Sequence, residues 1–318
     1  MISADQIRHR LKLRHLNVLQ AVVEQGSMVK AAEQLAVSQP VVSKAIADLE
    51  ETLGLRLLER GQRGVEPTTY GRALLKRSIA IFDDLRTSVR ELEFLADPTA
   101  GELRIGCTEA MGVSLVPSTI ERMSRQYPRI RFEIVLADPE TLRDRDLRGR
   151  RVDLVIGQRI MPGVDVADLN VTLLYHDRLC VAVGMNHPLA SRRKVKLADL
   201  VDERWCLPPQ NHPAGALVFD AFRRSGLPPP QSIVTAPSAP FTCSLIANGQ
   251  YLGILGLVFL GAYAPRGTIK VLPVKLPIRQ WPTGILMLKN RAPNPAAKLF
   301  IECAQQVANS LADAGGRR

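Results

Sequence analysis

Three short helical segments, separated by tight turns, dominate the first fifty residues of the chain. Apolar side chains recur at helical spacing over residues 13–25, and Gly26 ends this segment. Ser27 and Ser38 each precede a further helical segment, so we expect both residues to be N-caps. Short helices joined in this way are typical of a helix-turn-helix.

The third helical segment has two different faces. Val42, Ile46 and Leu49 lie at i, i+4 and i+7 and predict its buried side. Small, polar or positively charged residues near the helix start form the other side: Gln39, Pro40, Ser43, Lys44 and Ala47. Such a face fits the major groove of DNA, where side chains near a helix N-terminus reach the base edges.

Two further elements complete the N-terminal part. Residues 53–69 predict a hairpin with Arg60 and Arg63 near its tip, which we interpret as a wing that contacts phosphates or the minor groove. A solvated basic turn is the alternative. Residues 70–95 predict a long amphipathic helix. A second copy of the helix would bury its apolar stripe, whereas packing on the chain's own C-terminal domain is the alternative.

From Glu102 onward, strand and helix patterns alternate, which predicts an α/β domain with mostly parallel sheets. Such sheets bind ligands beyond the carboxyl ends of their strands. Residues 96–101 separate this region from the long helix and predict a hinge.

Composition narrows the possible functions. No apolar stretch approaches the roughly 20 residues of a membrane span, and no signal peptide is evident, so we expect a cytoplasmic protein with no membrane partner. The net charge of +11 does not mark a DNA-binding surface, because residues 1–97 carry 14 basic and 13 acidic side chains and residues 98–318 carry 28 and 18. Five scattered cysteines form no zinc or disulfide pattern, and we expect no cofactor.

Residues 11–72 resemble the DNA-binding region of LysR-type transcriptional regulators. The match is carried by LRHLNVLQAVVEQGSMVKAAEQLAVSQPVVSKAIADLEETLGLRLLER and RGVEPTTYGRALL, with departures at Met28-Val29 and Tyr70. The remainder resembles the linker helix and effector domain of the family. The N-terminal stretch is most similar to the branch that contains the galactose-binding-protein regulator and the protocatechuate-pathway regulator.

The resemblance implies a mixed fold: an N-terminal all-α winged helix-turn-helix with a long linker helix, and a C-terminal two-lobed α/β effector domain similar to type 2 periplasmic binding proteins. The expected domains are 1–69 for DNA binding, 70–97 for the linker helix and hinge, and 98–318 for the effector domain, with lobe I at about 98–160 and 275–318 and lobe II at about 161–274. The chain is expected to cross between the lobes near residues 158–159 and 264–275.

The resemblance also implies partners and contacts. It implies a homodimer or a homotetramer that binds interrupted palindromes in double-stranded DNA, with RNA polymerase as a further partner. Carried over by position, base contacts are expected at Gln39, Pro40, Ser43 and Lys44. The other expected DNA contacts are Ser27, Lys30 and Ser38 at helix starts, and Arg60, Arg63 and Thr68 at the wing.

In the family, a small-molecule effector binds between the lobes. The candidate residues here are Thr108, Glu109, Thr141, Gln158, Arg159, Pro208, Ser238 and Phe241. Thr108 could equally serve only as a helix cap. Glu109 can accept hydrogen bonds from sugar hydroxyls, whereas Arg159 favours a carboxylate. The two resembled branches use a sugar and an aromatic-derived acid, and the sequence leaves both open.

Three other functions were weighed. Motifs of hydrolases, zinc peptidases and nucleotide-binding enzymes are not found, which argues against an enzyme. A cytoplasmic solute-binding protein would leave residues 1–95 unexplained. An architectural DNA-binding protein that is insensitive to metabolites would not need over 200 residues of α/β domain. We therefore expect a DNA-binding transcriptional regulator that responds to a small molecule.

Overall fold

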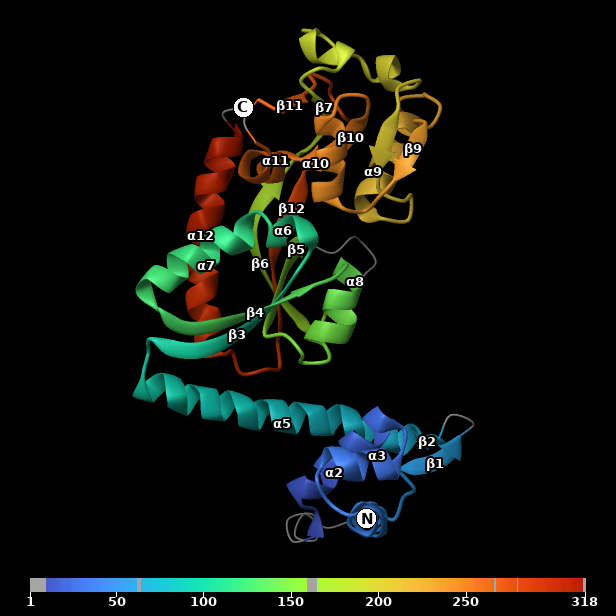
Figure 1. Ribbon diagram of the computed structural model, residues 1–318, viewed down its shortest axis with the longest axis vertical. Coiled ribbons are helices and arrows are strands. Elements are labelled where there is room, and N and C mark those ends of the chain that lie inside the picture. The colour runs from blue at the N-terminus through green and yellow to red at the C-terminus, as the bar shows by residue number, and fades with distance from the viewer. Residues whose placement is uncertain (1–9, 62–63, 159–164, 266, 279, 317–318) are drawn as a thin grey trace. The chain divides into compact units, whose positions relative to one another are not determined.

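The structure, a computed structural model, describes all residues except 1–9, 62–63, 159–164, 266, 279 and 317–318 (Figure 1). The chain divides into two compact units, Met1–Ser88 and Val89–Arg318. The boundary between them falls inside one long helix, so each unit contains part of that helix.

Three helices form the core of the first unit: α2 (Leu13–Gln25), α3 (Met28–Gln34) and α4 (Gln39–Leu53). Gly26 ends α2 in the left-handed conformation, with a φ of 62°, which glycine adopts without strain. Leu19, Val42 and Leu49 are fully buried where the three helices meet. The helices predicted from the sequence are therefore confirmed to within a residue at their ends.

Two antiparallel strands form the predicted hairpin: β1 (Leu58–Gly61) and β2 (Gly64–Pro67). The carboxylate of Glu50 in α4 accepts hydrogen bonds from the amides of Leu57 and Leu58, at 2.6 and 3.1 Å. The amide of Val65 donates to the carbonyl of Gly26 at 2.9 Å. Hydrogen bonds therefore hold the hairpin against both α4 and the turn before α3.

Helix α5 (Thr69–Ala96) follows the hairpin and is 28 residues long, in agreement with the helix predicted over residues 70–95. Thr68 caps its start, because its hydroxyl accepts a hydrogen bond from the amide of Gly71 at 3.1 Å. A side chain at Gly71 would collide with the carbonyl of Leu57, so only glycine allows this close approach of α5 to the residue that precedes β1.

Two five-stranded sheets, one in each lobe, form the second unit. The order in the first sheet is β4 (Arg129–Leu136), β3 (Ala100–Cys107), β5 (Leu154–Gln158), β12 (Trp281–Leu288) and β6 (Leu169–Asp177). The order in the second is β11 (Ile269–Val271), β7 (Leu179–Gly184), β10 (Leu252–Gly256), β8 (Trp205–Leu207) and β9 (Ser232–Thr235).

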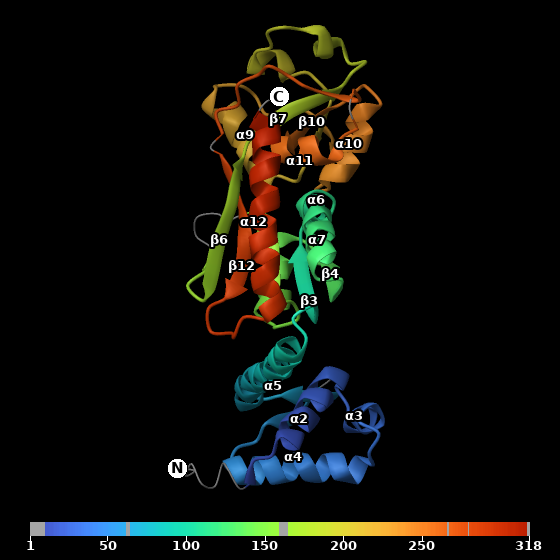
Figure 2. The same ribbon diagram turned by 90° about the vertical axis from the view of Figure 1, so that its left-hand side faces the viewer.

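Helices cover both sheets. Those of the first lobe are α6 (Glu109–Gly112), α7 (Leu115–Gln126), α8 (Pro139–Thr141), the π-helical turn η1 (Leu142–Leu147) and α12 (Pro295–Gly316). Those that follow second-lobe strands are the 3₁₀ turns η2 (Pro188–Ser191) and η3 (Leu197–Leu200), α9 (Pro213–Arg224), α10 (Ala239–Ala247) and α11 (Leu257–Tyr263). Helix α12 packs against α7 and β6 (Figure 2), and Phe300 lies fully buried in that core.

The topology corrects two expectations. The sheets are not mostly parallel, because β12 runs antiparallel to both β5 and β6, and β7 runs antiparallel to β10 and β11. The assignment of β6 to lobe II is also wrong, since β6 pairs along its length with β12 in the first sheet. The chain therefore crosses between the lobes at Arg178, and crosses back between Val271 and Trp281. In the first sheet, one strand inserted from a distant part of the chain, β12, accounts for both differences.

A buried ion-pair cluster lies where α5 enters the second unit. Asp153, just before β5, accepts hydrogen bonds from the guanidinium groups of Arg104 at 3.0 Å and Arg291 at 2.8 Å. Arg90 of α5 lies 3.4 Å from the same oxygen and pairs with Glu102 at 2.8 Å. Burial alone would raise the pKa of Asp153, but Arg104 and Arg291 outweigh it and hold that pKa below its ordinary value.

Candidate nucleic-acid interface and ligand cavity

Helix α4 presents the predicted base-reading face to solvent. The side chains of Gln39, Pro40, Ser43 and Lys44 are all exposed, on the side opposite the buried residues of the helix. Val41 is also exposed, at 51%. We did not predict it, because an apolar residue in a helix is ordinarily assigned to the core. Its isopropyl group offers this face an apolar contact of the kind that thymine methyl groups accept.

The starts of α3 and α4 differ in their caps. Ser27 caps α3, since its hydroxyl accepts a hydrogen bond from the amide of Lys30 at 3.5 Å, and the side chain of Lys30 is exposed. Ser38 occupies the predicted N-cap position of α4 but makes no side-chain capping bond. Pro40 removes one amide from the first turn, and the amide of Val41 donates to the carbonyl of Ser38 instead.

The structure describes only some of the predicted DNA contacts of the hairpin. The hydroxyl of Thr68 donates to the carbonyl of Arg56 at 2.8 Å while it caps α5, so Thr68 stabilises the junction between the hairpin and the helix. The backbone of Arg60 lies in β1. The side chain of Arg60 and the whole of Arg63 lie outside the described residues.

A cavity of about 470 Å³ opens in the second unit and is lined by residues from both lobes. Its volume is in the range of small-molecule sites. Four predicted effector residues line it: Thr108, Glu109, Pro208 and Ser238. Two do not, and this corrects the prediction: Thr141 is engaged by hydrogen bonds within α8, and Phe241 is half exposed. The side chain of Gln158 and the whole of Arg159 lie outside the described residues.

Four polar residues of the cavity were not predicted: Asp138, Asp177, His212 and Thr242. Asp138 and His212 both precede a proline that opens a helix, which is an N-cap signal that the sequence contains. Asp177 is the last residue of β6, beside the lobe crossing. No local signal marks it, because its position in the cavity depends on the strand order.

The charge states of these residues follow from their surroundings. Hydrogen bonds from Thr141 and the amide of Glu140 hold the pKa of Asp138 below its ordinary value. Burial raises the pKa of Asp177, against the hydrogen bonds that its carboxylate accepts from backbone amides. Burial lowers the pKa of His212, while Asp138 acts in the opposite direction.

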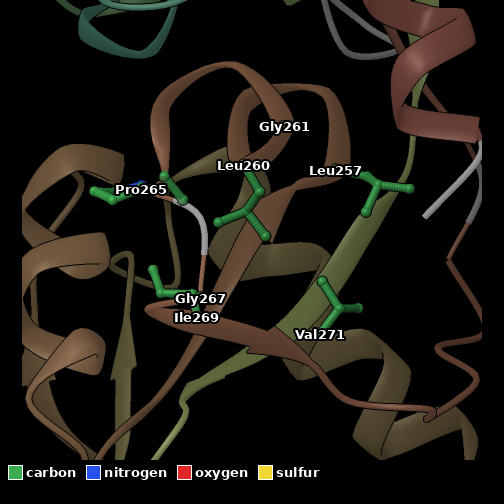
Figure 3. Close-up of a pocket in the computed structure, with 8 residues that line it drawn as sticks. Leu257, Leu260, Gly261, Pro265, Gly267, Ile269 and Val271 are labelled. Carbon is green, nitrogen blue, oxygen red and sulfur yellow. The ribbon is translucent and has the colours of Figure 1, made fainter.

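A second hollow, of about 120 Å³, lies between α11 and the approach to β11 (Figure 3). Leu257, Leu260, Ile269 and Val271 line it, together with Pro265 and small residues. Phe259 of the same helix lines the larger cavity. Helix α11 therefore contributes to a hollow lined by apolar side chains and to a cavity that contains charged groups.

The two parts of the chain match two family models. One, described as "Bacterial regulatory helix-turn-helix protein, lysR family", matches residues 13–72, and the other, "LysR substrate binding domain", matches residues 96–309. The chain belongs to the LysR family. It is therefore a DNA-binding transcriptional regulator with an effector-binding domain, and its relatives are regulators rather than enzymes.

Similar proteins support this assignment. The HTH-type transcriptional regulator GbpR of Azospirillum brasilense is 31% identical over 293 residues, which cover 92% of this chain and 85% of GbpR. PcaQ of Agrobacterium fabrum is 26% identical and covers 96% of this chain and 98% of its own. Full-length OxyR C199D from Pseudomonas aeruginosa has the same fold, with a TM-score of 0.67 at 22% identity and 95% of each chain covered. The resembled branch of the LysR family is thereby confirmed.

In the part of this LysR-type regulator that the structure describes, no helix is both long enough and apolar enough to cross a membrane. In the same part, no group of three or more His, Cys, Asp or Glu side chains could hold a metal ion together.

Proposed function

We propose that α4 lies in the major groove of an operator and reads bases with Gln39, Pro40, Ser43 and Lys44. The exposure of all four side chains on one helix face is the observation that supports this role. Ser27 and Lys30 at the start of α3, Ser38 at the start of α4, and Arg60, Arg63 and Thr68 at the hairpin are the proposed phosphate and minor-groove contacts. The contacts to the DNA backbone position the helix, and the contacts to the bases specify the DNA sequence.

We further propose that two chains pair through α5. Its apolar side chains are exposed in the single chain, with Leu85, Val89, Leu92 and Leu95 at 46%, 54%, 67% and 72%. A stripe of this kind is buried when two such helices pair. A homodimer would match the two halves of a palindrome, and a homotetramer would bind two such sites. The protein would act in the cytoplasm, with RNA polymerase as a partner at the promoter.

The cavity of the second unit is the proposed effector site, for a sugar or an aromatic-derived acid. Effector binding would change the closure of the two lobes and so the spacing of the paired DNA-binding units. The ligand can shift that equilibrium only through its different affinity for the two arrangements. A footprint that no metabolite alters would instead favour an architectural DNA-binding protein.

Lys44→Ala tests the base-reading assignment. We expect operator affinity to fall about tenfold, because the loss of a specific base contact costs roughly 1–3 kcal/mol. Fluorescence anisotropy with a labelled operator gives the affinity, and circular dichroism shows whether the fold is kept. Lys298→Ala, at an exposed position on α12, is the matched control and should bind like the wild type. Equal affinities for the two variants would show that Lys44 does not contact DNA.

A further inference from the structure

At two helix starts beside the cavity, backbone amides that could bind an anion are already engaged. Two helices of useful length begin there, α9 and α10, and each is capped by its own side chain. His212 Nδ1 accepts from the amide of Ala214 at 3.3 Å, and Ser238 Oγ accepts from the amide of Phe241 at 3.1 Å. Each helix also has a proline in its first turn, which removes one more donor. These helix starts therefore have few amides to offer a carboxylate or phosphate.

Two carboxylates of the chain occupy further backbone donors. Asp138 accepts from the amides of Glu140 and Thr141, at 3.0 and 2.9 Å. Asp177 Oδ1 accepts from the amides of Arg178 and Val258, at 2.8 and 3.0 Å. The chain's own carboxylates thus take four backbone hydrogen bonds that an anionic effector could otherwise accept, whereas the start of the one-turn helix α6 has no capping bond from Thr108.

The charges of the residues that line the cavity also disfavour an anionic effector. Glu109 is a third carboxylate at the cavity, and the lining residues that the structure describes include no lysine or arginine. Among these lining residues, His212 is the one whose side chain can become positively charged, and burial lowers its pKa. Because Nδ1 accepts a hydrogen bond, neutral His212 has its proton on Nε2 and can donate it to a ligand. An anion would meet repulsion from three carboxylates, whereas hydroxyl groups would find acceptors and one donor.

The rest of the wall is apolar. Leu136 and Leu179 line the cavity with Ile254, Leu255 and Phe259, and they come from both lobes. We infer that the effector is an uncharged, hydroxyl-rich molecule with one apolar face, as in a monosaccharide ring, and is not an organic acid. This ligand class rests on the proposed effector role of the cavity.

Calorimetric titration of the full-length protein tests the ligand class. Neutral pentoses and hexoses are titrated first, and the tightest is then compared with its uronic acid, which differs only by a carboxylate. The same comparison is made between 3,4-dihydroxybenzaldehyde and 3,4-dihydroxybenzoate. We expect the neutral sugar to bind at least tenfold more tightly than its uronic acid and than the benzoate. Tighter binding of either acid, or no binding of any neutral sugar, would overturn the inference.

Asp138→Asn tests the carboxylate itself, because the amide oxygen still accepts hydrogen bonds but the charge is lost. We expect the preference for sugar over uronic acid to fall at least fivefold. Glu140→Gln is the matched control, since Glu140 is exposed, lies two residues away and does not line the cavity. An equal change in both variants would contradict a local role of Asp138.

Arg159→Ala tests the alternative, an acid effector that is held by Arg159. We expect sugar affinity to stay within twofold of the wild type, whereas an acid effector held by Arg159 would lose at least tenfold. Footprinting of an operator with and without the bound sugar keeps the two proposals apart. Sugar binding that leaves the footprint unchanged would contradict the effector role and leave the ligand class standing. Acid binding that changes the footprint would support the effector role and contradict the ligand class.

Discussion

Asp153 and Asp177 are both almost fully buried, and they lie at opposite ends of the first sheet. Asp153 precedes β5 and is surrounded by Arg90, Arg104 and Arg291. Asp177 ends β6 at the lobe crossing, and its two hydrogen bonds come from backbone amides. Equal burial thus has opposite results, since the pKa of Asp153 is lowered and that of Asp177 is raised.

The two ends of the sheet differ in how strongly the charge of the buried carboxylate is stabilised. At Asp153, positive side chains from α5, β3 and the loop before α12 share one carboxylate, so the cluster ties these elements together only while that carboxylate is charged. At Asp177, the charge is opposed by burial and supported by backbone amides and, more weakly, by the positive charge of Arg178. The charge of Asp177 is therefore less well stabilised than that of Asp153, which three guanidinium groups share.

The same substitution at both positions should separate the two ends most clearly. We expect Asp153→Asn to lower the free energy of unfolding of the second unit by about 3–5 kcal/mol, because it leaves buried guanidinium groups without the charge that they share. The new amide group would also place N–H donors against N–H donors. Urea denaturation followed by circular dichroism measures the change. Asp202→Asn, at an exposed position, is the control and should unfold like the wild type. A loss at Asp153 no larger than at Asp202 would contradict the role of the cluster.

How well the sequence predicted each region depends on how local that region is. Helices α2, α3 and α4 and the exposed face of α4 lie within about forty consecutive residues, so periodicity and caps were enough to predict them. Ser38 was also located correctly as the N-cap of α4, although its side chain makes no capping hydrogen bond.

The cavity could be predicted only in part, because its residues come from loops that the sheets bring together. Thr108 and Ser238 were found because each lies at a helix start that the sequence reveals. Asp177 was missed because β12 inserts between β5 and β6, and pairing between strands so distant in the chain leaves no mark on local periodicity. The buried partners of Asp153 were missed for the same reason.

Asp177→Asn is the counterpart of the first substitution and should have a much smaller effect. The amide keeps the oxygen that accepts from Arg178 and Val258 and removes a charge that burial disfavours. We expect the free energy of unfolding at neutral pH to stay within about 1 kcal/mol of the wild type. The same urea titration measures it, with Asp177→Ala as a comparison that loses the hydrogen bonds as well. A loss at Asp177→Asn as large as at Asp153→Asn would mean that the two ends do not differ.

The pH dependence of the two variants should show the smallest effect and the sharpest contrast. A raised pKa in the folded state means that the folded protein binds more protons than the unfolded chain, so protonation of Asp177 stabilises the wild type as the pH falls toward the ordinary value of 3.8. A lowered pKa means the opposite for Asp153, whose contribution is complete above 3.8 and is lost only below it.

As the pH falls from 7 toward the ordinary value of 3.8, we therefore expect the wild type to gain stability relative to Asp177→Asn, by at most about 1 kcal/mol, while its difference from Asp153→Asn stays nearly constant. Urea titrations at four pH values measure both differences. His212, whose pKa burial lowers, is present in all three proteins, so its contribution largely cancels. A constant difference for Asp177→Asn would mean that its carboxylate does not change protonation in this range. A difference that shifts in favour of the variant would reverse the sign of the pKa change. Either result would remove the contrast between the two ends of the sheet.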